Sequence, residues 1–332
     1  MVSPVRSPGA VAFEELEPFR RQLTAYCYRM LASPHDAEDA VQETFVRAWR
    51  GLSGLDERAG LRPWLYRIAT NVCLDVLKGR NRRALPTSIA PAVRGQRWGA
   101  SHELALGLPR PEATWVQPIP DSLIEATDAD PAEAAVRRES IRLAFVAALQ
   151  HLQPRQRAVL ILRDVLRWKA EEVAGLLGSS ADAVNSTLRR ARAAMGRAGL
   201  DGGPPGRREL DLELLGRYVQ AFERYDVDAL VALLHEDALL TMPPFALWLQ
   251  GVADIGRFLA AMAGEGGRDQ VVPLVANGSP ALGVYRPGRE SGEPEAFAIQ
   301  VLECARGRIV EIHAFLEPEL FAVFGLPPVL AS

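Results

Sequence analysis

Residues 170–192 restrict the possible folds of this chain more than any other segment. Two patterns of apolar residues recur there at helical spacing, and each predicts a helix with one buried face: Val173, Leu176 and Leu177, then Val184, Leu188 and Ala191. Between them, Gly178 can end the first helix with a positive φ, and Ser179 or Ser180 can cap the second. The segment therefore predicts a helix-turn-helix.

The outward face of the second helix is polar. Asn and Arg side chains suit bidentate contacts with base edges or phosphates. The residues left outside are Asp182, Asn185, Ser186, Arg189, Arg190 and Arg192. This face predicts a DNA-recognition surface; the alternative is a helical hairpin of an ordinary soluble bundle, whose arginines are only solvated.

The distribution of charge favours the DNA-binding interpretation. Residues 134–200 contain 12 basic and 5 acidic residues, a net charge of +7, whereas residues 208–332 contain 9 basic and 18 acidic residues, a net charge of -9. The overall net charge of -3 thus hides a basic module beside an acidic one. A local basic patch is the electrostatic footprint of nucleic-acid binding.

Composition sets ordinary bounds. A chain of 332 residues with 48% hydrophobic and 24% charged content is typical of a soluble protein with two or three domains. No apolar run has the length of a signal peptide or a membrane span, so we expect a cytoplasmic protein. Cys27, Cys73 and Cys304 lie far apart with no His at ligand spacing, so we expect buried thiols, no metal and no cofactor.

Four regions follow along the chain. Residues 10–83 have a helical pattern, and residues 84–133 contain seven prolines with little periodicity, which predicts a linker without a core of its own. Residues 134–200 are helical again. After a Gly- and Pro-rich break, residues 208–328 mix helical and strand patterns.

The N-terminal region has a strong helix start at Ser33 and Pro34, with Ser as cap and Pro at the first position. The helix that follows is predicted to have an apolar stripe and highly charged faces. The stripe contains Val41, Phe45, Ala48 and Trp49, and the charged residues are Asp39, Glu43, Arg47 and Arg50.

Residues 61–83 predict a further helix in which aromatic and basic residues alternate. Such interleaving suits single-stranded nucleic acid, because bases stack on aromatic side chains and phosphates meet arginine. The polar side chains presented are Arg67, Asn71, Lys78, Arg80, Arg82 and Arg83. Alternatively, Trp64 and Tyr66 only pack inside a small bundle.

Together, residues 33–49, residues 64–75, residues 152–163 and the helix-turn-helix resemble the extracytoplasmic function group of bacterial sigma-70 transcription initiation factors. The resemblance implies that residues 36–50 bind the β′ clamp helices of core RNA polymerase. Its candidate contacts there are Asp39, Glu43, Arg47 and Trp49.

The resemblance also implies two promoter contacts. The segment from about Leu52 to Lys78 would open and capture the minus-ten element, through Arg67 and Asn71 with Lys78 and Arg80. Residues 134–200 would bind the β flap and read the minus-thirty-five element in the major groove. The candidates there are Asn185, Ser186, Arg189 and Arg190.

Two further features bear on the resemblance. Residues 84–133 stand where this family threads a linker through the RNA exit channel of the polymerase. The stretch Asp182 to Leu188 has neutral residues at two positions that are basic in many relatives. The resemblance therefore does not predict which DNA bases this helix prefers.

The C-terminal region predicts two amphipathic helices over 209–238, then a strand from Leu239. Alternating runs at Ala281–Tyr285, Ala296–Cys304 and Arg308–Phe315 predict antiparallel strands. This order resembles the SnoaL-like or nuclear-transport-factor-like α+β cone, which serves as a built-in regulator in a subset of the group. The expected fold is therefore multidomain, with two all-α sigma domains and a C-terminal α+β cone.

Three roles are open for this cone. As an enzyme it would use His235, Asp237, Asp254 or His313 as general acid or base, but no spacing among them demands catalysis, so we expect no enzyme. As a sensor it would bind a small molecule in a pocket lined by Met242, Phe245, Trp248 and His313. As a packing domain it would only contact the sigma domains.

For the whole chain, we expect a sigma factor whose acidic C-terminal domain tunes activity by contacting the basic sigma domains. The alternative is a helix-turn-helix repressor with a ligand-binding domain, which would bind duplex DNA without polymerase.

Overall fold

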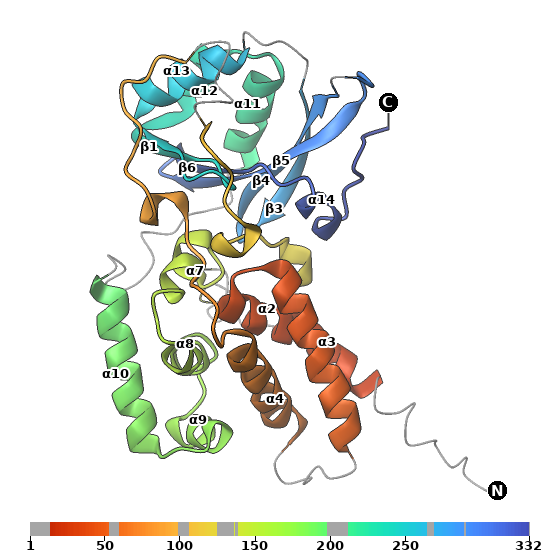
Figure 1. Cartoon of the computed structure of the whole chain (residues 1–332), viewed down its shortest axis with the longest axis vertical. Coiled ribbons are helices and arrows are strands. Elements are labelled where there is room, and N and C mark those ends of the chain that lie inside the picture. The colour runs from red at the N-terminus through yellow and green to blue at the C-terminus, as the bar shows by residue number, and fades with distance from the viewer. Residues whose placement is uncertain are drawn as a thin grey trace, which may run out of the picture. The chain divides into compact units, whose positions relative to one another are not determined.

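A computed structural model describes residues 14–52, 60–98, 106–124, 136, 139–197, 212–263, 269–288 and 290–331. The chain forms two compact units (Figure 1). One contains Met1–Arg83 and Ser122–Gly203, and the other contains Ala84–Asp121 and Pro204–Ser332. The two helical regions, which are far apart in sequence, therefore share one unit.

The first helical region begins with the short η1 (Glu17–Phe19) and contains the helices α2 (Arg20–Leu31), α3 (Pro34–Gly51) and α4 (Leu61–Val76). The start of α3 agrees with the sequence analysis, because the Ser33 hydroxyl accepts a hydrogen bond from the Asp36 backbone N–H at 3.4 Å. The three helices pack on one another through a core rich in aromatic side chains.

The second helical region contains α7 (Leu143–Leu149), α8 (Pro154–Leu160), the π-helical η6 (Ile161–Val165), α9 (Ala170–Leu177) and α10 (Ala181–Arg197). The helix-turn-helix is confirmed in α9 and α10. Gly178 ends α9 in the left-handed conformation, with a φ of 61°. The Ser180 hydroxyl then accepts from the Ala183 N–H at 3.2 Å, so Ser180 is the residue that caps α10.

The second unit contains a six-stranded sheet in the order β2-β1-β6-β5-β4-β3. Its strands are β1 (Leu234–Thr241), β2 (Trp248–Gln250), β3 (Gln270–Ala276), β4 (Ser279–Pro287), β5 (Pro294–Ala305) and β6 (Arg308–Phe315). The strands predicted from alternation are confirmed as β4, β5 and β6. The second predicted helix ends earlier than expected, because residues from Leu234 pair in parallel with β6.

Helices α11 (Leu212–Glu223), α12 (Val227–Leu233) and α13 (Val252–Ala263) pack on one face of this sheet. Side chains alternate between faces along a strand, so Leu240 and Ile312 enter that core, whereas their neighbours Thr241 and His313 lie on the opposite face. On the opposite face, α14 (Leu320–Val323) brings Phe321 close to Gly283.

The first part of the predicted linker packs at the sheet edge of the second unit. Val93 forms a parallel bridge with Leu249 of β2, and its N–H donates to the Trp248 carbonyl at 3.0 Å. The Trp248 indole in turn donates to the Ala90 carbonyl at 2.8 Å. Trp98 then packs edge to face on Phe258 of α13, with ring centroids 5.0 Å apart. These contacts cover an otherwise open strand edge.

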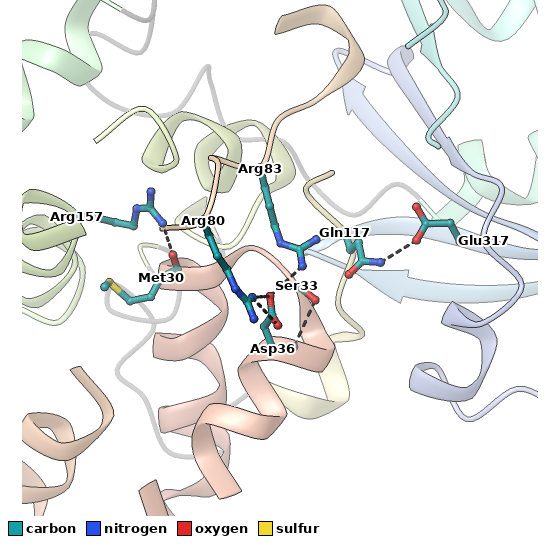
Figure 2. A network of polar contacts seen from close by, with 8 residues as sticks. All are labelled: Met30, Ser33, Asp36, Arg80, Arg83, Gln117, Arg157 and Glu317. Carbon is teal, nitrogen blue, oxygen red and sulfur yellow. Dashed lines mark hydrogen bonds and ion pairs between the residues drawn. The ribbon is translucent and has the colours of Figure 1, made fainter. Parts of the chain in front are cut away.

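Residues 115–121 are fixed to the same unit at two further places. Gln117 donates to the Glu317 carboxylate at 2.7 Å (Figure 2). Near the β3–β4 turn, the Ile119 N–H donates to the Asn277 side chain at 3.0 Å, and Asp121 accepts from the Gly278 N–H at 2.9 Å. The described residues of the proline-rich segment up to Asp121 are therefore irregular, as composition predicts, but residues 90–98 and 115–121 pack on the C-terminal domain.

Candidate polymerase and promoter interfaces

The outer face of α3 presents a large apolar side chain. Trp49 is 55% exposed and Val46 is 40% exposed. The sequence analysis placed Trp49 on the apolar stripe with Val41, Phe45 and Ala48. That prediction is wrong for Trp49, because only Val41, Phe45 and Ala48 are buried. At about 100° per residue, Trp49 lies roughly 80° around the helix from Val41, at the margin of the stripe.

Charged residues surround this exposed face. Glu43 and Arg47 form an ion pair at 2.7 Å, and Arg47 also lies 3.7 Å from Asp75 of α4. Lys78 donates a hydrogen bond to Asp75 at 2.7 Å, and this bond, with the Lys78 and Arg47 charges, lowers the pKa of Asp75. Asp39 is exposed one turn before Glu43. All four predicted polymerase contacts thus lie on the accessible part of α3.

Helix α4 separates a buried face from a polar one. Arg67 and Asn71 are exposed one turn apart, whereas Leu65, Val72 and Cys73 are buried. Arg67 and Asn71 therefore lie on one accessible face of α4. The loop predicted to act with them includes residues 53–59, which lie outside the described residues.

Arg80, a predicted DNA contact, is engaged within the protein. Its guanidinium donates to both carboxylate oxygens of Asp36 at 3.0 Å, and Arg83 donates to the same carboxylate at 2.9 Å (Figure 2). Arg83 is buried, whereas Arg80 is half exposed. In the sequence, Asp36 was notable only as an acid in the first turn of a helix. No local pattern links it to arginines more than 40 residues later.

We expect Asp36→Asn to lower the free energy of unfolding by about 1–3 kcal/mol, because two charge-assisted hydrogen-bond donors lose their common carboxylate. Urea unfolding followed by circular dichroism measures this change. The matched control is Asp39→Asn, an exposed residue of the same helix, which should change stability by less than about 0.5 kcal/mol. Equal stability of the two variants would show that the Asp36 contacts contribute nothing.

The second candidate promoter face lies on α10. Asn185, Arg189 and Arg190 are exposed and Ser186 is half buried. Within the part of the chain that the structure describes, neither Arg189 nor Arg190 pairs with a carboxylate; Arg190 contacts only the Thr187 hydroxyl, at 3.2 Å. By contrast, Arg192 forms a two-pronged ion pair with Asp164, at 2.9 and 2.7 Å. Arg189 and Arg190, which lie on the predicted recognition face, are therefore free of carboxylate partners among the described residues.

The four predicted pocket residues are divided between the two faces of the sheet: Trp248 and His313 both pair in register with Thr241, whereas Met242 and Phe245 belong to the core on the other face. Met242 and Phe245 pack in the core beneath the helices, and the Trp248 indole contacts the Ala90 carbonyl. His313 lies on the opposite face of the sheet, where its Nδ1 is 2.9 Å from the Thr241 hydroxyl and its Nε2 is 3.0 Å from Glu311. Strand alternation is the sequence signal that places position 313 on the opposite face of the sheet from position 312.

The other possible acid–base residues of this domain are also dispersed. Asp254 accepts from the Gly95 N–H at 2.9 Å and pairs with Arg257, whereas His235 accepts a hydrogen bond from the Asp237 backbone N–H at 3.2 Å. Within the described ranges, no cluster of His, Cys, Asp and Glu side chains could hold a metal ion. Nor does any described helix combine the length and apolar character needed to cross a bilayer.

Comparison with protein families matches three parts of the chain in order. Residues 16–83 match sigma-70 region 2, residues 142–195 match sigma-70 region 4, and residues 215–312 match the SnoaL-like domain. These matches coincide with the two helical regions and the sheet domain described above.

Two relatives from Mycobacterium tuberculosis match nearly the whole chain. The extracytoplasmic function RNA polymerase sigma factor SigG is 45% identical over 322 residues, covering 94% of this chain and 82% of SigG. Sigma factor SigJ is 28% identical and covers 92% of both chains. The crystal structure of SigJ gives a TM-score of 0.59 at 25% identity, over 95% of this chain and 99% of SigJ. The chain therefore belongs to the extracytoplasmic function group of sigma-70 RNA polymerase sigma factors, and it is a promoter-specific transcription initiation factor with a fused SnoaL-like domain.

Proposed function

We propose that this sigma factor binds the β′ clamp helices of core RNA polymerase through the outer face of α3, and the β flap through residues 142–195. The exposure of Trp49 is the observation that supports binding through α3. Trp49 is 55% exposed beside the exposed Val46, and tryptophan is among the residue types most enriched in the hot spots of protein interfaces. The flanking charges of Asp39, Glu43 and Arg47 form the polar rim that surrounds such an anchor. Because polymerase and promoter DNA occupy the bacterial cytoplasm, we propose that the protein acts there.

We expect Trp49→Ala to weaken binding to core polymerase about tenfold, because interface tryptophans commonly contribute about 2 kcal/mol. Titration of labelled chain with core polymerase measures the affinity. Arg50→Ala, an exposed neighbour, is the control and should change it less than threefold. If the Trp49 variant binds core polymerase with unchanged affinity, the exposed face of α3 around Trp49 is not part of the interface.

For the promoter, Arg67 and Asn71 of α4 are our candidates for the single-stranded minus-ten element, supported by Lys78 and Arg80. Asn185, Ser186, Arg189 and Arg190 of α10 are our candidates for the minus-thirty-five element. The supporting observation is that α10 presents two unpaired guanidinium groups on the outer face of a helix-turn-helix. Helices of this kind insert into the major groove.

We infer that the C-terminal domain regulates activity in cis by holding the linker. The connection between regions 2 and 4 is the segment that relatives thread through the RNA exit channel. Here its residues 90–98 and 115–121 pack on the C-terminal domain. A segment held in this way is not available for threading. The opposite charges of the two parts further support attraction between the C-terminal domain and the sigma regions, which salt would screen.

We do not propose an enzymatic role or a cofactor for this domain. The side chains of the expected acid–base residues lie in different places, and His313 and Asp254 are committed to internal contacts.

A gel-shift experiment separates the proposed function from the repressor alternative. Promoter fragments from the chain's own gene region are incubated with the full chain, with core polymerase, or with both. The proposal predicts a stable complex only with both, since core polymerase supplies much of the binding surface. A tight, sequence-specific shift with the chain alone and no change upon adding polymerase would favour the repressor.

The regulatory part is tested with Asn277→Ala, which removes the side-chain acceptor of the Ile119 N–H. We expect transcription by the reconstituted holoenzyme to change at least threefold, because release of residues 115–121 raises the fraction of molecules whose linker is detached from the C-terminal domain. Ser291→Ala, in an exposed turn of the same domain, is the control. Identical transcription by wild type and N277A, with the linker shown by proteolysis to be released, would contradict regulation through the linker.

A further inference from the structure

We propose that the surface of α13 around Phe258, which the linker residue Trp98 covers, is a binding site for a small, uncharged, two-ring aromatic molecule. This surface is called the Phe258 site below. A bound molecule displaces the Trp98 indole and so removes one of the contacts that hold the linker. The site lies wholly within the second unit. Its effect on transcription rests on the proposed regulation through the linker.

Trp98 fills the place that such a molecule would take. Its indole packs edge to face on the Phe258 ring, with ring centroids 5.0 Å apart, where the linker passes α13 (Figure 1). It also lies against the apolar core of the domain, to which Phe258 belongs. Phe258 is 7% exposed and Trp98 is half-buried. Aromatic pairs of this geometry attract one another beyond the area that they bury, so the indole itself shows one ring system that the site accepts.

The polar atom of the Trp98 ring is not satisfied in this position. Its Nε1 is buried, yet it donates to no acceptor among the described residues. By contrast, the Trp248 indole, which holds the preceding part of the linker, donates to the Ala90 carbonyl at 2.8 Å. A buried donor without an acceptor has lost its hydrogen bond to water and gained none in return, which weakens the contact. A ring of the same shape without this N–H should therefore bind the site more tightly than indole does.

Glycine residues on both sides of Trp98 allow it to leave the site. Gly95 donates its N–H to Asp254 at 2.9 Å and has a φ of 65°, a conformation that glycine adopts without strain. In the sequence, Gly99 follows Trp98 directly. The bridge of Val93 to β2 lies before Gly95, so it does not depend on the position of the indole. Trp98 can therefore be displaced while the preceding part of the linker remains bound.

Release of the linker uncovers apolar surface. The proposed regulation requires that the linker leave the C-terminal domain, and Val93 and Trp98 both pack against the core that contains Phe258. Their departure exposes part of that core to water, which is unfavourable. A molecule that covers the Phe258 site binds the state with a displaced Trp98 and not the state with a bound one. It therefore shifts the population toward molecules with a released linker.

The surroundings of the site favour an uncharged ring. Asp254, one turn before Phe258, pairs with Arg257 and accepts from the linker backbone, so no free carboxylate is at hand for a cationic ring. The net charge of -9 over residues 208–332 disfavours an anionic ring. Indole and benzofuran meet these requirements. They have the same shape, but benzofuran has an oxygen in place of the N–H, so the two form a matched pair of probes.

The first test measures binding of both probes to the full chain by isothermal titration calorimetry. W98A should bind benzofuran about tenfold more tightly than wild type, because in wild type the tethered indole competes for the site at a high effective concentration. W98A should also bind benzofuran about fivefold more tightly than indole, because only indole buries an unpartnered N–H. L108A, at an exposed position of the same linker, should match wild type. If W98A binds neither probe, or binds benzofuran no more tightly than wild type does, the proposal is overturned.

The second test locates the bound molecule. F258L in the W98A chain keeps an apolar side chain but removes the ring, and it should weaken benzofuran binding about fivefold, which is the size of an aromatic pair contact. Circular dichroism confirms that the double variant is folded. Unchanged affinity of the folded double variant would show that benzofuran binds elsewhere. If the double variant unfolds, the displacement of Trp98, measured as follows, decides the location.

Displacement of Trp98 is followed by fluorine NMR of the full chain, with its six tryptophans replaced by fluorotryptophan. The signal that is absent from W98F belongs to Trp98, and the signal that is absent from W248F belongs to Trp248. As benzofuran is added, the Trp98 signal should move toward the position of the urea-unfolded chain, and the Trp248 signal should stay. A Trp98 signal that does not change while benzofuran binds would overturn the proposal.

These measurements use neither polymerase nor DNA, so they test the site independently of the proposed function. If benzofuran displaces Trp98 but leaves transcription by the holoenzyme unchanged, the site is supported and regulation through the linker is contradicted. If N277A changes transcription but W98A binds neither probe, regulation through the linker is supported and the Phe258 site is overturned.

Discussion

Replacing Arg189 and Arg190 together with alanine is expected to remove most promoter-dependent transcription while the protein remains folded. Both side chains are exposed on α10, and in the described part of the chain neither is neutralised by a carboxylate. An arginine contact with a base edge contributes about 1–3 kcal/mol, so the double variant should lose roughly 30-fold or more in promoter affinity. Run-off transcription and filter binding with the holoenzyme measure the two losses.

The matched control is Arg192→Ala, on the same helix. Its guanidinium is already paired with the Asp164 carboxylate, so it is less available for DNA than Arg189 or Arg190, and transcription should fall less than threefold. Salt dependence adds a second criterion. If the lost contacts are to phosphates, the slope of log affinity against log salt should fall by about one for each arginine. Full activity of the double variant would place promoter recognition elsewhere on the chain.

Trp115→Ala is expected to destabilise the second unit by about 3–5 kcal/mol, because it removes one of the largest fully buried side chains and leaves a cavity. Trp115 belongs to the linker, yet it is 0% exposed, and its neighbour Val116 donates its N–H to the Ala84 carbonyl at 3.0 Å. For a domain of this length the melting temperature should fall by roughly 6–20 °C. Differential scanning calorimetry of the full chain measures the shift.

This prediction separates two views of the linker. If residues 84–121 only connect the sigma regions, W115A should leave the melting of the C-terminal domain unchanged. If they are part of its packed structure, the loss should appear in the transition of that domain. Leu108→Ala, at an 89% exposed position of the same linker, should shift neither transition.

Local patterns in the sequence were sufficient to predict several helices and strands. The helix-turn-helix was predictable because its apolar spacing, the left-handed Gly178 and the Ser180 cap agree over a short stretch. Strands β4, β5 and β6 were predictable from alternation. Strand β2 has only three residues, and β3 contains Pro273 at the edge of the sheet, so both lacked a clear pattern.

Contacts between distant residues were not predictable from local patterns. The Asp36 carboxylate meets Arg80 and Arg83 only after the chain has passed through two helices. The docking of Ile119 on Asn277 joins residues 158 positions apart. In the same way, Arg157 of α8 meets the Met30 carbonyl of α2 across 127 positions. In each case the local sequence pattern does not show which distant residue will be the partner.

Run-off transcription with purified core polymerase tests the central claim most directly. The polymerase is supplied alone, with the full chain, or with the variant lacking Arg189 and Arg190, on a library of promoter fragments. We predict discrete transcripts that require the full chain and are lost with the double variant. If the full chain directs no transcript that core polymerase alone does not make, across the whole library, promoter-specific initiation by this chain is contradicted.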